Sequence, residues 1–161
     1  MSVATHTAVD GGIRIVPLTP EVLMLALACM RGDELTLALH TEAWARKIIA
    51  PPSIAYAVLE GGYILGAGGL FQHWPGRGDM WMVVTRFARR RHLALGTRFA
   101  RRVVDAAQAY ADWRRVEVCL PLMAPWRKSF ARALGFAGAG QLQEAWGPDG
   151  AAYVLYARVV R

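Results

Sequence analysis

Apolar and polar positions show two different periodicities along this chain, and each periodicity predicts one kind of secondary structure. Short apolar or alternating runs bounded by glycine or proline predict strands. We predict strands over Ile13–Val16, Ile54–Leu59, Tyr63–Gln72, Met80–Thr85, Val116–Leu120, Phe136–Ala145 and Ala152–Val159. Apolar residues that recur every three or four positions predict helices. We predict helices over Pro20–Met30, Asp33–Leu39, Thr41–Ala50, Arg89–Asp112 and Pro125–Leu134.

The residues between these elements are those that usually cap helices and make tight turns. Thr19-Pro20-Glu21 starts a helix, and Pro51-Pro52 ends another. Glu60-Gly61-Gly62 and Gly147-Pro148-Asp149-Gly150 each join two strands, which is typical of hairpins. Helices that interleave with strands, together with two hairpins, predict an α+β fold: a mixed, mainly antiparallel central sheet with flanking helices.

Length and composition limit the chain to one ordinary globular domain. It has 161 residues, of which 55% are apolar and 19% charged, and this excludes a disordered chain. We predict a flexible leader over residues 1–12 and a single domain over residues 13–161. The longest apolar run, Val22–Met30, is far shorter than the roughly 18 residues that cross a bilayer. We therefore expect no membrane partner.

The termini and the cysteines favour a cytoplasmic location. The first twelve residues hold no lysine, no arginine and no apolar run, so they do not resemble a signal peptide. Cys29 and Cys119 both lie in apolar surroundings and cannot form a disulfide framework. We expect two buried free thiols, as in a reducing compartment.

Positive charge is concentrated in one part of the chain. The formal net charge is +7, and the segment from Arg86 to Arg102 contains no acidic residue. Its arginines are Arg86, Arg89, Arg90, Arg91, Arg98, Arg101 and Arg102. Such a field suits a phosphate-bearing partner. We do not expect nucleic acid, because no known nucleic-acid-binding pattern accompanies the charge. We expect no metal either, since the chain has no HExxH and no CxxC pair.

Three segments of the chain carry motifs that occur together in one known family. After the predicted strand Met80–Thr85, the six residues Arg91-His92-Leu93-Ala94-Leu95-Gly96 match the pattern (Gln/Arg)-x-x-Gly-x-(Gly/Ala), with Ala94 at the first glycine. Ser129–Phe136 ends in Leu-Gly-Phe, and the final hairpin leads into Tyr153–Arg158. With this loop, this helix end and this hairpin, the chain resembles the GNAT superfamily of acetyl-CoA-dependent N-acetyltransferases.

This resemblance implies the GNAT fold and the transfer of an acetyl group from acetyl-CoA, as co-substrate, to a primary amine. The residues implied for the cofactor's diphosphate are Arg91, Leu93, Ala94, Leu95 and Gly96. The main chain of Met82, Val83 and Val84 would pair with the pantetheine amides. The diphosphate site also follows from physics, because a strand that enters a helix through a loop presents unpaired N–H groups and the positive end of the helix dipole.

Glu117 is the residue that we predict as catalytic. It alternates with Val116 and Val118 on a predicted inner strand, and burial there would raise its pKa and suit a general base. The alternative is a carboxylate paired with Arg114, Arg115 or another arginine. His73 and Asp79 are further candidates. Ala131 stands where many family members carry a tyrosine that acts as general acid, so no acid is identified.

A looser resemblance, to divergent GNAT-like proteins of tailed bacteriophages, leaves a second function open. In that case the chain is a catalytically degenerate GNAT-fold protein that acts as a virion-associated or protein-binding module, with phage or host proteins as partners. It would then lie in the host cytoplasm or in a virion. The alanines at positions 94 and 131 favour this alternative. No motif identifies the acyl acceptor or the oligomeric state.

Overall fold

The computed structural model describes residues 7–9, 12–31, 41–144 and 150–160. The chain forms two compact units. The first unit consists of residues 1–71 and 81–93, and the second of residues 72–80 and 94–161. The expectation of one domain over residues 13–161 stays a prediction.

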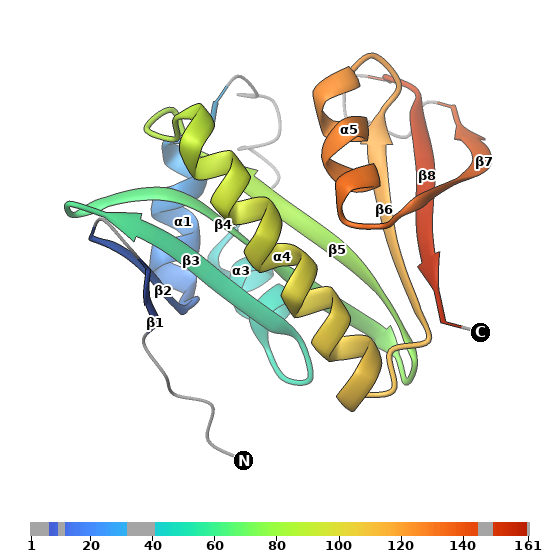
Figure 1. Cartoon of the computed structure of the whole chain (residues 1–161), viewed down its shortest axis with the longest axis horizontal. Coiled ribbons are helices and arrows are strands. Elements are labelled where there is room, and N and C mark those ends of the chain that lie inside the picture. Colours follow the sequence, from blue (N-terminus) through green and yellow to red (C-terminus); the bar gives the residue numbers. More distant parts are fainter. Residues whose placement is uncertain (1–6, 10–11, 32–40, 145–149, 161) are drawn as a thin grey trace. The chain divides into compact units, whose positions relative to one another are not determined.

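The first unit combines antiparallel strands with two helices. Its complete elements are β1 (Thr7–Val9), β2 (Ile13–Pro17), α1 (Pro20–Ala28), α3 (Glu42–Ile49) and β3 (Ile54–Glu60). It also contains most of β4 (Tyr63–Trp74), the end of β5 (Arg77–Val84) and the start of α4 (Arg90–Tyr110). β1 pairs with β2, β2 with β3 and β3 with β4, all antiparallel. Figure 1 shows α1 beside α3.

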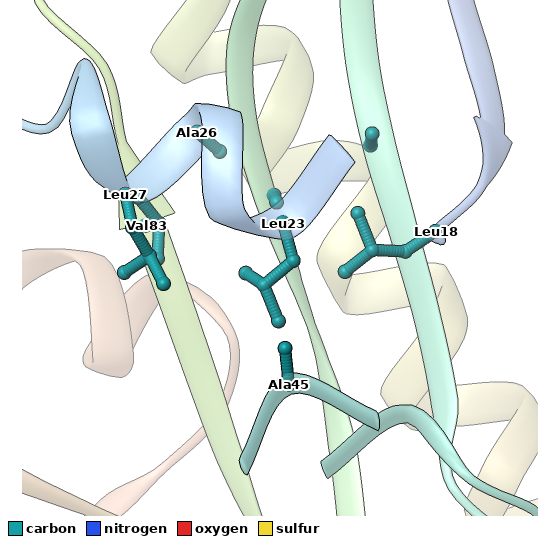
Figure 2. Close-up of a cluster of buried hydrophobic side chains, with 8 residues drawn as sticks. Leu18, Leu23, Ala26, Leu27, Ala45 and Val83 are labelled. Carbon is teal, nitrogen blue, oxygen red and sulfur yellow. The ribbon is translucent and has the colours of Figure 1, made fainter. Parts of the chain in front are cut away.

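A cluster of small and branched apolar side chains forms the core of this unit. The hydroxyl of Thr19 caps α1 by accepting a hydrogen bond from the N–H of Val22 (3.4 Å). From this start, Leu23, Ala26 and Leu27 lie on one face of α1 and are fully buried or nearly so. Figure 2 shows Leu23 with Leu18 and Ala45 around it. Ala57, Ala67 and Val83 supply the sheet side of the cluster.

The second unit contains the rest of α4 and the C-terminal elements. These are β6 (Arg115–Pro121), α5 (Pro125–Ala133), β7 (Ala137–Gln143) and β8 (Tyr153–Val159). β8 pairs antiparallel with both β6 and β7, and α5 lies beside β6 (Figure 1). Arg158 of β8 contacts both helices, because its guanidinium donates to Asp105 of α4 (2.5 Å) and to the main-chain oxygen of Leu134 (3.0 Å).

Strand pairing confirms the predicted fold class. Hydrogen-bonded neighbours follow the order β1-β2-β3-β4-β5-β6-β8-β7. β5 pairs with β6 in parallel, and this ladder joins Arg77, Gly78 and Asp79 to Arg115, Val116 and Glu117. The sheet is therefore mixed and mainly antiparallel, with flanking helices.

Several element boundaries differ from the sequence prediction. Thr7–Val9 lies inside the predicted leader but pairs with β2, so the prediction of a flexible segment is wrong there. β5 begins at Arg77 rather than Met80, because only Pro75 and Gly76 lie between the end of β4 and the start of β5. The predicted helix Asp33–Leu39 and most of the predicted turn Gly147–Gly150 lie outside the described residues. Within the described ranges, no helix is long and apolar enough to cross a bilayer.

Strand β4 carries glycines where neighbouring main chains come very close. A Cβ at Gly66 or Gly68 would lie 2.8 Å from the main-chain oxygen of Val83 or Trp81 on β5. A Cβ at Gly69 would collide with the main-chain oxygen of Ile54 and lie 2.8 Å from the Cα of Ala55. Only glycine fits at these three positions of β4, because the main chains of β3 and β5 lie too close for a Cβ.

We predict that Gly69→Ala lowers the free energy of unfolding by about 1–3 kcal/mol, because the added methyl must displace the backbone of β3. Gly96→Ala is the matched control, since a Cβ at Gly96 meets nothing within 4 Å and alanine favours a helix interior. Urea unfolding of the two variants measures both effects. Equal stabilities would contradict the packing described for β4.

Candidate functional site

The loop between β5 and α4 is held by hydrogen bonds at both of its ends. The hydroxyl of Thr85, which is fully buried, donates to the main-chain oxygen of Ile64 (2.6 Å) and accepts from the N–H of Phe87 (3.3 Å). The main-chain N–H of Arg31 donates to the main-chain oxygen of Val84 (3.0 Å), and its guanidinium donates to the main-chain oxygen of Ala88 (3.0 Å). The position at which α4 begins is therefore closely determined.

The first turn of α4 offers unpaired main-chain donors. The N–H of Arg89 donates to Nδ1 of His92 (3.0 Å), an imidazole on a residue that is only 5% exposed. The main-chain N–H groups of Arg90 and Arg91, by contrast, have no acceptor among the described residues. Both groups therefore remain available to a ligand at the positive end of the helix dipole.

Positive side chains surround this helix start. Arg86, Arg89, Arg90 and Arg91 are exposed, and the first turn of α4 contains no acidic residue. The guanidinium of Arg91 is anchored, since its Nη2 lies 3.1 and 3.2 Å from the two carboxylate oxygens of Glu60. This combination of free N–H groups and guanidinium groups matches what a diphosphate needs.

The residues predicted for the diphosphate all lie in the first two turns of α4. Ala94 is exposed, so its methyl group, which replaces the family's glycine, does not fill a buried space. The open space beside Gly96 also allows close approach of a ligand to the helix. The structure thus brings Arg91, Leu93, Ala94, Leu95 and Gly96 into one helical segment, and a diphosphate site there stays a prediction.

The residues predicted for pantetheine lie on β5, and part of their main chain is already bonded. The side chain of Val83 belongs to the core of the first unit, whereas that of Met82 is exposed. The prediction of an open main chain is wrong at the oxygen of Val84, because that atom accepts the hydrogen bond from Arg31 (3.0 Å). Pairing of pantetheine with Met82, Val83 and Val84 stays a prediction.

Glu117, the predicted catalytic residue, lies on β6 in the second unit and is only 4% exposed. Arg77 donates to its Oε2 from Nη2 (2.6 Å) and Nε (3.0 Å), and Arg115 donates to its Oε1 from Nε (2.6 Å). Burial raises the pKa of Glu117, but the hydrogen bonds and charges of the two arginines together lower that pKa below its ordinary value. The expected raised pKa is therefore wrong, and the alternative of pairing with arginine is what the structure shows.

The remaining candidates of the second unit lie near this ion cluster. His73 and Asp79, from the two strands of one hairpin, meet at 2.9 Å between Nε2 and Oδ2. The guanidinium of Arg77 also lies 4.6 Å over the ring of Trp74. Burial, followed by the negative charges of Asp79 and Glu117, raises the pKa of the Cys119 thiol. Cys119 therefore stays protonated at neutral pH and is a poor nucleophile.

Glu60 and Arg77 belong to these clusters, but the sequence pattern does not identify either as a site residue. Glu60 falls in a predicted hairpin turn, and Arg77 falls outside the predicted strand Met80–Thr85. Trp81 carries a buried Nε1 donor that has no partner in the described part of the chain. The two-residue spacing of Arg115 and Glu117 places both on one face of β6, in agreement with the predicted alternative of their pairing.

Both cysteines are free thiols, as expected, but each is half-buried rather than buried. Among the described residues, no group of three or more His, Cys, Asp or Glu side chains is arranged to hold a metal ion.

Solved structures of acetyltransferases share this fold at low sequence identity. An acetyltransferase of the GNAT family from Streptococcus pneumoniae has a TM-score of 0.69 and 16% identity, over 92% of this chain and 99% of that chain. An IAA acetyltransferase from Bacillus cereus has a TM-score of 0.68 and 14% identity, over 92% of this chain and 99% of that chain. A ribosomal-protein-S5-alanine acetyltransferase from Vibrio fischeri has a TM-score of 0.69 and 9% identity, over 96% of both chains.

No protein-family model and no curated protein matches the sequence. The names of these similar structures give no support to the bacteriophage resemblance. What the likeness does show is the architecture: the chain has the fold of the GNAT acetyltransferases, the acyl-CoA N-acyltransferase fold.

Proposed function

We propose that this protein is an acyl-CoA N-acyltransferase that transfers an acetyl group from acetyl-CoA to a primary amine. The observation that carries the proposal is the start of α4, where the N–H groups of Arg90 and Arg91, which no described residue accepts, lie among exposed arginines. The GNAT fold supports it, because acetyltransferases with this fold are the structures that the chain is similar to.

In this proposal the helix start binds the diphosphate of the co-substrate. The N–H groups of Arg90 and Arg91 donate to its oxygens, and the guanidinium of Arg91 adds a charge-assisted hydrogen bond. The small residues Ala94 and Gly96 let it approach the helix. The main chain of β5 at Met82 and Val83 orients the pantetheine arm. When bound, acetyl-CoA supplies the acetyl thioester that the amine attacks.

Proton transfer receives little help from the groups named so far. Glu117 is held as a carboxylate by Arg77 and Arg115, and a carboxylate of low pKa is a weak base. Ala131 is buried and offers no proton donor at the position where a tyrosine would act as general acid. Solvent would then accept the proton of the amine and supply one to the sulfur. Catalysis in this proposal depends mainly on positioning the amine against the thioester.

The same two observations favour a second candidate, a binding module that holds the co-substrate or a protein partner without turnover. Glu117 is paired with two arginines and Ala131 cannot act as a general acid. Both observations are compatible with a protein that keeps the GNAT fold but no longer catalyses the reaction. Release of free thiol from acetyl-CoA in the presence of a panel of amino acids, polyamines and a lysine-containing peptide distinguishes the two. Turnover that requires an amine supports the enzyme, and tight binding without any turnover supports the module.

We predict that Arg91→Gln raises the Kd for acetyl-CoA at least about tenfold, because a charge-assisted hydrogen bond contributes about 1.5–3 kcal/mol and about 1.4 kcal/mol is a factor of ten. Arg101→Gln is the matched control, since it removes the same charge from an exposed position farther along the same helix. Isothermal titration calorimetry of the wild type and both variants measures the difference, and the control should stay within about twofold. If millimolar acetyl-CoA gives the wild type neither heat nor a thermal shift, the proposed function is wrong.

We also predict that Glu117→Gln lowers the free energy of unfolding at pH 7 by about 1–3 kcal/mol, since Arg77 and Arg115 lose their charged acceptor. The pKa of Glu117 is lowered in the folded protein, so its contribution is complete above the ordinary value of 4.5 and is lost as the pH falls through the lowered pKa. Urea unfolding at pH 7 and near pH 3 should show that the difference in free energy of unfolding between wild type and variant becomes smaller at the lower pH.

Glu144→Gln is the control for this series, because Glu144 is exposed, and it should leave stability nearly unchanged at both pH values. A gap between wild type and Glu117→Gln that widens with acid would contradict the lowered pKa.

A further inference from the structure

His92 is a buried histidine with both ring nitrogens in polar contact, at the point where α4 begins. Its Nδ1 accepts the hydrogen bond from the main-chain N–H of Arg89 (3.0 Å). Its Nε2 lies 3.3 Å from Oε2 of Glu60, at the end of β3. All of these residues belong to the first unit. Neither the fold likeness nor the proposed chemistry requires a histidine here.

Both ring nitrogens of His92 face a donor: the N–H of Arg89 at Nδ1 (3.0 Å) and Nε of Arg91 at Nε2 (2.8 Å). A neutral imidazole accepts at only one of its two nitrogens, so these two hydrogen bonds are alternatives. When Nδ1 is the acceptor, the proton on Nε2 faces the carboxylate of Glu60 at 3.3 Å. Nη2 of Arg91 contacts both oxygens of Glu60. Glu60 thus holds His92 and Arg91 together, and we refer to these three side chains as the Glu60 cluster.

The bond from Arg89 to His92 has the geometry of a helix cap. The third residue of a helix commonly carries a Glu or Gln whose side chain accepts a hydrogen bond from the N–H of the residue before the helix. Here Arg89 precedes the helix and His92 is its third residue, so the imidazole takes the place of that side chain. A shift of the helix start by one residue would rotate the outward N–H groups by about 100°.

We propose that His92 is a positioning residue of the diphosphate site. Its Nδ1 fixes Arg89 as the cap, so the N–H groups of Arg90 and Arg91 are the ones left for the ligand. Through Glu60 it also holds the guanidinium of Arg91 beside the same helix start. His92 acts through these groups and does not touch the ligand. The inference rests on the proposed function, because that function places a diphosphate here.

The test compares two substitutions of His92 that differ in their ability to cap. His92→Gln restores the usual capping side chain, whereas His92→Leu keeps bulk but has no acceptor. Isothermal titration calorimetry with acetyl-CoA should show a Kd about tenfold higher for His92→Leu and within about twofold of the wild type for His92→Gln. Amide hydrogen exchange by NMR, measured without acetyl-CoA, should show the N–H of Arg89 protected in the wild type and in His92→Gln but not in His92→Leu.

A control variant separates this role from general stability. The hydroxyl of Thr41 caps α3 by accepting from the N–H of Trp44 (3.2 Å), so Thr41→Val removes a cap from another helix. This variant should lose stability, as His92→Leu does, and yet bind acetyl-CoA with the wild-type Kd.

The outcomes distinguish the inference from the proposed function. If the wild type binds acetyl-CoA and His92→Leu binds equally well, the inference is overturned and the proposed function stands. If His92→Gln binds as weakly as His92→Leu, or if the Arg89 N–H is unprotected in the wild type, the cap is not what positions the site and the inference is again overturned. If the wild type does not bind acetyl-CoA, the proposed function fails and the inference fails with it.

Discussion

The rest of the candidate site depends on where β5 ends and α4 begins. The buried hydroxyl of Thr85 fixes this point by bonding to β4 and to the N–H of Phe87, and Arg31 fixes it from the segment after α1. His92 then caps the helix itself. These bonds occupy the N–H groups on either side, whereas the N–H groups of Arg90 and Arg91 have no acceptor within the part of the chain that the structure describes. A helix start that is determined in this way is preorganised for an anion, which reduces the cost of ordering the main chain when the anion binds.

The second constraint is electrostatic and concerns Glu117. Burial disfavours the charged form of its side chain, but two guanidinium groups at 2.6 Å favour that form and lower the pKa. The side chain is therefore a carboxylate near neutral pH and does not exchange protons there. This explains why a buried carboxylate on an inner strand is not automatically a general base. Arg77 reaches it because the parallel ladder sets Arg77 opposite Arg115 and Asp79 opposite Glu117. The negative charge of Glu117 therefore helps to hold β6 to β5, through its ion pair with Arg77.

The sequence predicted the order and type of most elements because their signals are local. The Thr19-Pro20-Glu21 cap, the glycine turn after β3 and the spacing of apolar residues in α4 each depend on a few neighbouring residues. β1 was missed because three residues give little periodicity, although Asp10-Gly11-Gly12 has hairpin composition. The pairing of Glu117 with Arg77 could not be predicted, since 40 positions separate them and only the strand order brings them together. The role of Glu60 was hidden for the same reason, because its partners lie in a helix that starts 30 residues later.

The central claim is that the unpaired N–H groups at the start of α4 bind the diphosphate of acetyl-CoA. Amide chemical shifts recorded by NMR during a titration with acetyl-CoA test it most directly, because they report on the donors themselves. The account predicts that the amides of Arg90 and Arg91 shift most, followed by those of Leu93–Gly96. Shifts confined to Arg98–Arg102, or amides at the helix start that do not respond to acetyl-CoA, would contradict it.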